Sequence, residues 1–312
     1  MNSLLDISHI DVAYGNKQIL FDVSLSVSPG RICGIVGESG SGKSTVIYST
    51  LGILGNGEVT SGSIRYQEND LTSLPASRLR QIRGREMALV AQNSIGSFHP
   101  TRRIRTQLKE LVACHKGIEY KDAEQRMCQL MTAFGLKDAK KILNSHPFEL
   151  SGGMCQRVSI AMAMCMEPAL LLADEPTSAL DVVSQAQVVE ELARVRQEAN
   201  VAILIVSHNM GVISRLADDV VVMYAGRILE SGPTKEVIEE PAHPYTRNLI
   251  RAIPRMGEKA PQGIRTNGQD RTLAGCPYQN ECPHCDQACK EGVPPLASIN
   301  GNHKVRCHKA LQ

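Results

Sequence analysis

A glycine-rich loop directly after an apolar run constrains the fold of this 312-residue chain more than any other stretch. Residues 31–36 have the apolar character of a central strand, and residues 37–44 read Gly-Glu-Ser-Gly-Ser-Gly-Lys-Ser. This spacing is typical of a phosphate-binding loop, in which glycines let backbone N–H groups converge on phosphate oxygens. The N-terminus of a following helix adds a favourable dipole. The sequence therefore predicts a strand, a phosphate loop and a helix from residue 43 to about residue 54.

Two side chains of this loop meet the needs of a bound nucleotide. Lys43 is expected to bridge the β- and γ-phosphates, and Ser44 is expected to ligate Mg²⁺. A simple Gly/Ser turn would not explain why Lys43, Ser44 and Thr45 follow at this spacing. A nucleotide with Mg²⁺ is therefore the predicted ligand.

Polar side chains end three further apolar runs that have the character of buried strands, namely Gln92, the pair Asp174 and Glu175, and His208. In an open parallel sheet the carboxyl ends of the strands line the ligand site. Asp174 is placed to hold Mg²⁺, and Glu175 to polarise the water that attacks the γ-phosphate. Gln92 can reach the same ion and water. Each residue alone has an ordinary structural explanation, but the set indicates catalysis.

The remaining patterns predict mixed α and β elements. Alternating residues 5–12 and 20–27 predict an antiparallel hairpin or meander, and residues 57–66 predict another hairpin. Apolar residues at three- and four-residue spacing predict helices over 101–143. No apolar run approaches the roughly 18–20 residues that cross a bilayer, and the N-terminus lacks a signal-peptide pattern. We expect a cytosolic chain.

A glycine-marked helix start lies between the strand-end groups. Residues 150–157 read Leu-Ser-Gly-Gly-Met-Cys-Gln-Arg, and a helical run continues to about residue 166. The Ser151 hydroxyl and the backbone N–H groups of Gly152 and Gly153 would form an anion-binding helix N-terminus.

Together these features resemble an ATP-binding cassette (ABC) ATPase over residues 1–235. The phosphate loop resembles the Walker A motif, residues 170–175 resemble Walker B, and residues 150–156 resemble the signature motif. Gln92, His208 and Asp181 resemble residues of the Q-loop, the switch and the D-loop. The resemblance implies an α/β P-loop NTPase (RecA-like) core with a mainly parallel sheet. It also implies an N-terminal antiparallel β subdomain and an α-helical subdomain at about residues 95–165.

The resemblance further implies which residues bind and hydrolyse ATP. Catalysis is assigned to Glu175, His208 and Gln92, and Mg²⁺ to Ser44, Gln92 and Asp174. In the family, two subunits, alike or different, pack head to tail around two ATP molecules, and each ATP also meets the partner's signature motif. The implied contacts are, to the chain's own ATP, Tyr14, Gly37, Ser39, Gly40, Gly42, Lys43, Ser44 and Thr45, and, to the partner's ATP, Ser151, Gly152, Gly153 and Gln156.

Residues 236–312 resemble the C-terminal extension of importer ATPases for dipeptides, oligopeptides and nickel. The resemblance is carried by Pro241-Ala242-His243-Pro244-Tyr245 and by a short helix expected to end at Pro254. It implies a subunit that lies on the cytoplasmic face of the cell membrane. The implied partners are two transmembrane permeases and, indirectly, an extracytoplasmic substrate-binding protein.

Five of the ten cysteines lie in this Cys-rich extension, which is too poor in large aliphatic residues to bury a core of its own. Cys276, Cys282, Cys289 and Cys307 have spacings of five, six and seventeen intervening residues. The same importer family places a [4Fe-4S] cluster on such a pattern in some members. Cys285 is extra, and it opens the alternative of zinc held by Cys282-x-x-Cys285 with a histidine, the candidates being His284, His303 and His308. Reduced thiols without a metal are the third alternative.

The rival function is a soluble ABC ATPase that acts on ribosomes or DNA. The chain carries one cassette and no long inserted coiled coil, and its 34 Lys and Arg are balanced by 32 Asp and Glu. It has no Trp for base stacking. We therefore expect no nucleic-acid partner. An ATP sensor without turnover is a further alternative, against which Glu175 and His208 both count.

Overall fold

The computed structural model describes residues 3–178, 180–253 and 274–310. The chain forms two compact units, which are described separately. The first comprises residues 1–28, 32–73 and 206–312, and the second comprises residues 29–31 and 74–205. Pro254, the predicted end of a helix, lies outside the described residues.

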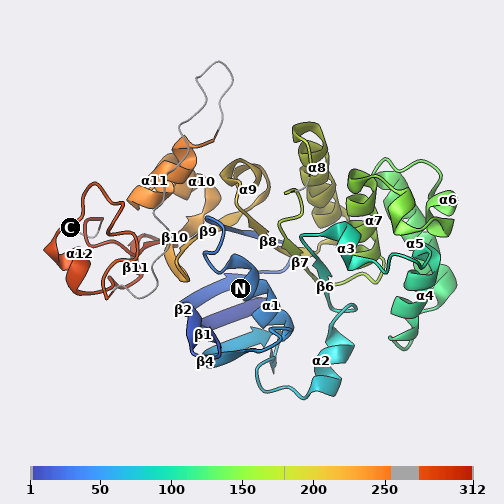
Figure 1. Ribbon diagram of the computed structural model, residues 1–312, viewed down its shortest axis with the longest axis horizontal. Helices are drawn as coiled ribbons and strands as arrows, with labels where there is room; N and C mark the ends of the chain where they lie inside the picture. Colours follow the sequence, from blue (N-terminus) through green and yellow to red (C-terminus); the bar gives the residue numbers. More distant parts are fainter. Residues whose placement is uncertain (1–2, 179, 254–273, 311–312) are drawn as a thin grey trace. The chain divides into compact units, whose positions relative to one another are not determined.

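The first unit contains a four-stranded antiparallel sheet with the order β2-β1-β4-β5 (Figure 1). Its strands are β1 (Leu5–Tyr14), β2 (Lys17–Val27), β4 (Gly57–Tyr66) and β5 (Asn69–Asp70). The predicted hairpin of β1 and β2 is confirmed. Residues 57–66 form one strand rather than a second hairpin, because Gly62 does not turn the chain back. At φ +81° it passes so close to β1 that a Cβ would lie 2.4 Å from the His9 carbonyl oxygen.

A second sheet of the first unit has the order β11-β12-β10-β9-β3. β3 (Ile32–Val36) is parallel to β9 (Asp219–Tyr224), and the other neighbours are antiparallel. All five residues of β3 are buried, as its apolar composition predicts. The remaining strands are β10 (Arg227–Pro233), β11 (Ala297–Asn300) and β12 (His303–Val305), and the helices are α1 (Lys43–Leu51), α9 (Met210–Leu216), α10 (Thr234–Glu239), α11 (Pro244–Arg251) and α12 (Gln287–Glu291).

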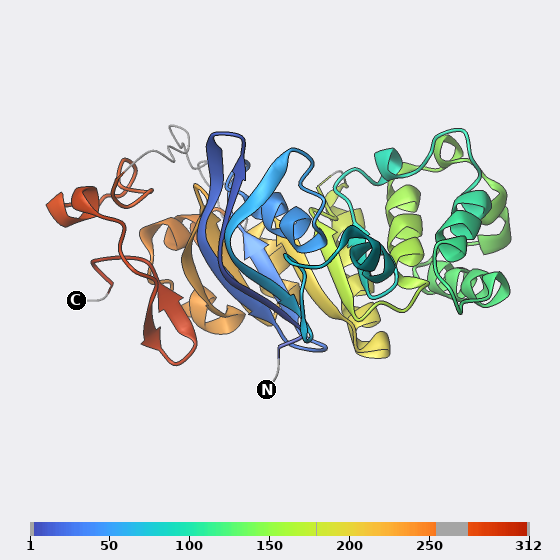
Figure 2. The ribbon, with the colours of Figure 1, turned by 90° about the horizontal axis from the view of Figure 1, so that it is seen from below.

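The second unit combines parallel strands with a group of helices. β6 (Met87–Val90) pairs in parallel with β7 (Leu170–Asp174), and β8 (Ala202–Ser207), which runs on into the first unit, neighbours β7. Figure 2 shows the helices between residues 104 and 164 gathered together in green. They are α4 (Ile104–Ala113), α5 (Tyr120–Ala133), α6 (Ala139–Asn144) and α7 (Gly152–Met164), and the other helices are α2 (Ala76–Ile82), α3 (Ser94–Ser97), the 3₁₀ turn Pro147–Glu149 and α8 (Val182–Ala199). Among the described residues no helix is both long and apolar enough to cross a membrane.

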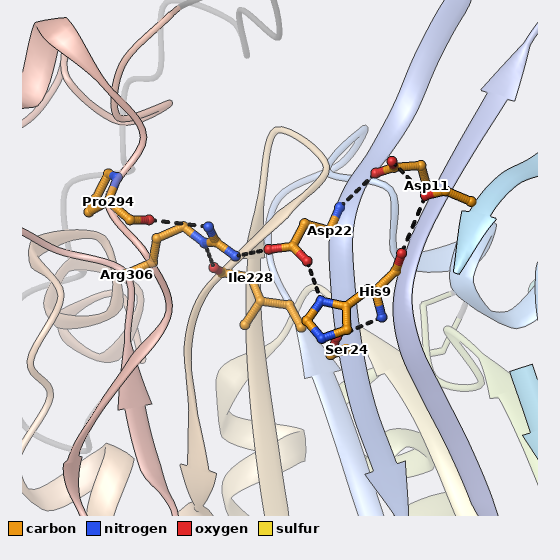
Figure 3. Close-up of polar contacts among 8 residues, drawn as sticks. His9, Asp11, Asp22, Ser24, Ile228, Pro294 and Arg306 are labelled. Carbon is orange, nitrogen blue, oxygen red and sulfur yellow. Dashed lines mark hydrogen bonds and ion pairs between the residues drawn. The ribbon is translucent and has the colours of Figure 1, made fainter. Parts of the chain in front are cut away.

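A buried arginine fastens the C-terminal extension to the N-terminal sheet (Figure 3). The Arg306 guanidinium donates hydrogen bonds to the carbonyl oxygens of Ile228, at 2.9 Å, and Pro294, at 3.1 Å. A third hydrogen bond, of 3.1 Å, reaches the carboxylate of Asp22, which also contacts His9 at 2.7 Å. Partial burial opposes ionisation of Asp22, but hydrogen bonds from His9 and Arg306 hold its pKa below the usual value. One cation therefore ties β2, β10 and the extension together.

We expect Arg306→Ala to destabilise the first unit. The change leaves two carbonyl groups without their donor, at a cost of about 2–4 kcal/mol. The measurement is the thermal midpoint together with the rate of chymotrypsin cleavage within residues 274–310. Asp22→Asn is the control. It removes only the half-exposed ion pair and should cost less than about 1 kcal/mol. Equal losses in both variants would contradict this account.

Candidate nucleotide site

The phosphate loop lies in the first unit between β3 and α1. At two of its positions, sterics require glycine. A Cβ on Gly37 would lie 2.1 Å from the backbone oxygen of Met223 in β9. Gly42 has φ +99°, and a Cβ there would lie 2.6 Å from the Leu20 side chain. A side chain at either position would push the loop out of place. The helix is shorter than predicted, because Gly52 adopts the left-handed conformation and ends it after Leu51.

Hydrogen bonds within the loop and from two distant residues hold it in place. The buried Lys43 ammonium donates to the Glu38 carbonyl oxygen at 2.7 Å. The Gly226 N–H donates to the Ser41 carbonyl oxygen at 2.9 Å, and the Glu38 N–H donates to the Tyr245 hydroxyl at 3.0 Å. Sequence reasoning missed Gly226 and Tyr245 as residues of this site. The only signal was that Tyr245 belongs to the His-Pro-Tyr stretch of the extension.

The other predicted ATP contacts of the first unit lie in the phosphate loop, in α1 and at the ends of β1 and β8. Ser39 and Gly40 are exposed at the tip of the loop, and Ser44 and Thr45 are half-buried in the first turn of α1. Tyr14 ends β1, and its ring lies against Gly57, where a Cβ would come within 2.8 Å of it. His208 is exposed directly after β8, and the following Asn209 caps α9.

The second unit brings Gln92 and Glu175 together. Gln92 follows β6, and its side-chain amide donates to the Glu175 carboxylate at 3.2 Å. Asp174 is buried at the end of β7. Glu175 has φ +45°, in the left-handed region that non-glycine residues rarely occupy. Such strain persists only where the surrounding structure imposes it, and it is concentrated at functional sites. The pair Gln92 and Glu175 is therefore a candidate catalytic centre.

The helix start predicted at residues 150–153 is also in the second unit. Ser151 caps α7 by accepting a hydrogen bond from the Met154 N–H at 3.3 Å. Ser151 and Gly152 are exposed, and among the described residues nothing lies within 4 Å of a Cβ placed on Gly152. Gln156 is buried instead, and its side chain accepts a hydrogen bond from the Ser94 hydroxyl. Asp181 caps α8 through the Ser184 N–H at 3.0 Å.

The cysteines of the extension lie near one another but do not form an ion site. Burial raises the pKa of the Cys276 thiol to about 12, and Cys289, Cys307 and Cys282 raise it further through their charge. Yet no group of three or more His, Cys, Asp or Glu residues in the described parts of the chain is placed to hold a metal ion. The structure therefore gives no support to the predicted iron–sulfur cluster or to zinc.

Two of the three histidine candidates for zinc, His303 and His308, have other contacts. His303 is buried in β12, and its Nε2 lies 2.7 Å from the carboxylate of Glu230. The Nε2 of His308 lies 3.4 Å from the Gly292 carbonyl oxygen. Cys285 is half-buried, and its Sγ contacts the Asp286 carbonyl oxygen at 3.7 Å.

Comparison with known proteins agrees with this architecture. Residues 20–178 match the ABC transporter family, and residues 229–289 match the oligopeptide/dipeptide transporter C-terminal region. Two solved structures share the fold: an ATP-binding subunit of an ABC transporter and cbiO1 of Clostridium perfringens, part of the transporter complex cbiONQ. Their TM-scores are 0.64 and 0.66 at 24% and 23% identity, over 76% and 77% of this chain and 93% and 92% of theirs. The chain is an ABC-type ATPase.

Curated relatives define its branch of the family. The dipeptide transport ATP-binding protein DppD of Haemophilus influenzae is 35% identical over 99% of this chain and 96% of its own length. The oligopeptide transport ATP-binding protein OppD of Salmonella typhimurium is 34% identical over 100% and 95%. A Brucella ovis ATP-binding protein named for peptide import is 40% identical over 92% and 90%. The chain belongs to the family of ABC transporter ATP-binding subunits that includes DppD and OppD.

Proposed function

We propose that this chain hydrolyses ATP to drive the import of peptides through partner permease subunits. The observation that carries the substrate class is the match of residues 229–289 to the C-terminal region of oligopeptide and dipeptide transporters. The names of the relatives DppD and OppD refer to dipeptides and oligopeptides. They give no support to nickel or to a soluble factor for ribosomes or DNA. We place the chain as a peripheral subunit on the cytoplasmic face of the membrane.

The proposed chemistry assigns one task to each side chain. Lys43 and the N–H groups of the phosphate loop bind the phosphates, and Tyr14 stacks on the adenine. Mg²⁺, when bound, neutralises phosphate charge, and Ser44, Asp174 and Gln92 are the side chains that suit it. Glu175 takes the proton of the attacking water and is oriented by the amide of Gln92 at 3.2 Å. His208 stabilises the charge on the γ-phosphate.

We further propose that each ATP site is completed by a second ATP-binding subunit. The N-terminus of α7 has the chemistry of an anion site, because the exposed residues Ser151 and Gly152 stand at the positive end of the helix dipole. A partner's γ-phosphate is the anion that the family resemblance supplies. The D-loop residue Asp181 would lie at the same interface. The proposed division is a nucleotide-binding domain over 1–235 and an extension over 236–312.

We expect Glu175→Gln to retain ATP binding, to reduce hydrolysis at least about 100-fold and to accumulate ATP-bound dimers. Adding Ser151→Arg to this variant should abolish the dimers and leave binding to the chain's own phosphate loop intact. Dimers are measured by light scattering, and binding with a fluorescent ATP analogue. Asn144→Arg in the Glu175→Gln background is the control, because it adds the same charge at an exposed position of α6.

Two results would contradict the shared site. One is near wild-type hydrolysis in the Glu175→Gln variant. The other is loss of ATP binding in the Ser151→Arg chain itself, since Ser151 would then serve its own nucleotide.

For the transport function, we expect the chain to sediment with membranes only when its permease subunits are co-expressed. Mass spectrometry of ligands released from the purified complex should then identify peptides. A ribosome factor would instead sediment with ribosomes, and a non-peptide ligand in the complex would refute the substrate class.

The [4Fe-4S] hypothesis rests only on the spacing and mutual proximity of four cysteines, namely Cys276, Cys282, Cys289 and Cys307. Under this hypothesis, protein purified without oxygen contains about four iron and four sulfide per chain. Stoichiometric zinc without sulfide, or no metal at all, would exclude the cluster. Elemental analysis decides between the three, and Cys276→Ser should lower a genuine iron content.

A further inference from the structure

A phenol of the C-terminal extension contacts the phosphate loop. Tyr245 lies in the first turn of α11 and is fully buried. Its hydroxyl oxygen is 3.0 Å from the backbone nitrogen of Glu38 and accepts a hydrogen bond from it. The two residues are 207 positions apart in the sequence. The extension thus supplies a polar atom to the loop that binds the nucleotide.

The peptide groups on either side of Glu38 are the point where several loop contacts meet. The Glu38 carbonyl oxygen accepts hydrogen bonds from the Lys43 ammonium at 2.7 Å and from the Ser41 N–H at 3.2 Å. Tyr245 therefore fixes the N–H of the same residue whose carbonyl group holds Lys43. A displacement of this segment would move the lysine that meets the phosphates.

Tyr245 is itself held firmly. The Nδ1 of His243 accepts a hydrogen bond from the Tyr245 N–H at 3.0 Å and so caps α11. Burial, with a contribution from the charge of Arg247, lowers the pKa of His243 to about 3, so its ring is neutral and can accept. The buried carboxylate of Glu230 accepts hydrogen bonds from two backbone N–H groups, that of His243 at 2.9 Å and that of Ala242 at 2.8 Å.

Aromatic contacts fix the ring of Tyr245. Its centroid lies 4.8 Å from that of Tyr224 in β9, in an edge-to-face arrangement. It lies 5.3 Å from the ring of Tyr278, which belongs to the segment that carries the cysteines. Edge-to-face rings at this spacing attract each other and leave little freedom for rotation. The Tyr245 hydroxyl is thus presented to the phosphate loop from a rigid support.

We propose that Tyr245 is a positioning residue of the ATP site, whose hydroxyl holds the Glu38 segment, and with it Lys43, in the arrangement that receives the phosphates. The proposal rests on ATP binding by the phosphate loop. It gives the His243-Pro244-Tyr245 segment a role in nucleotide affinity, in addition to the packing of the extension.

Tyr278 offers a matched control for general packing. It is as buried as Tyr245 and belongs to the same aromatic cluster. Its hydroxyl, however, accepts a hydrogen bond from the Asn248 side chain at 2.8 Å and not from the loop. Tyr245→Phe and Tyr278→Phe therefore each remove one buried hydroxyl and keep the ring. The first change deprives the Glu38 N–H of its acceptor, and the second deprives the Asn248 side chain.

The test measures ATP affinity and steady-state hydrolysis on the full-length chain. Tyr245→Phe should raise the Kd and the KM for ATP about fivefold, the effect of one neutral hydrogen bond, with a smaller change in kcat. Tyr278→Phe should leave the Kd near the wild-type value. Wild-type and Lys43→Ala chains, measured in parallel, establish the ATP site independently of Tyr245. An unchanged Kd in Tyr245→Phe, or an equal rise in both phenylalanine variants, would overturn the proposal.

Hydrogen exchange gives a second readout that does not depend on turnover. In the nucleotide-free protein, the Glu38 amide should exchange faster in Tyr245→Phe than in wild type, while Tyr278→Phe leaves it unchanged. Equal protection of this amide in wild type and Tyr245→Phe would also overturn the proposal, because the hydroxyl would then not be its acceptor.

Discussion

The phosphate loop of this protein depends on a backbone contact that admits no side chain. A Cβ on Gly37 would lie 2.1 Å from the Met223 carbonyl oxygen, well inside any contact distance. Only glycine allows the chain to leave β3 so close to β9. This contact places the first turn of α1, and therefore Lys43 and Ser44, beyond the carboxyl end of β3. The nucleotide chemistry of the first unit follows from this one steric condition.

The proposed catalytic residues of the second unit are held differently. Glu175 has a left-handed backbone and is paired with the amide of Gln92, so its position results from a local conformation imposed by the surrounding fold. The N-terminus of α7 has the opposite character, since its first residues, Ser151 and Gly152, are exposed. A held carboxylate and an exposed helix start are the two features on which the proposed shared ATP site depends.

The C-terminal extension is integrated into the first unit and is not an independent appendage. β12 continues the sheet beside β10, Arg306 bonds to β2, to β10 and to Pro294, and the buried Glu230 contacts His303. Charged groups at these positions are stable because each has well-placed partners. The extension in turn reaches the phosphate loop through Tyr245. Contacts from the last quarter of the chain therefore contribute to the stability of the phosphate loop.

The sequence alone determined the family, the central strand, the phosphate loop and the identity of the strand-end side chains. These depend on local spacing, on glycine, and on residue chemistry that chain order preserves. It did not reveal that residues 57–66 form a single strand, that Gln156 is buried against Ser94, or that the His303 ring contacts the Glu230 carboxylate. Nor did it reveal that Tyr245 contacts Glu38. Only the tertiary structure decided these points, because each depends on which distant segment packs beside the residue, and local sequence carries no record of that neighbour.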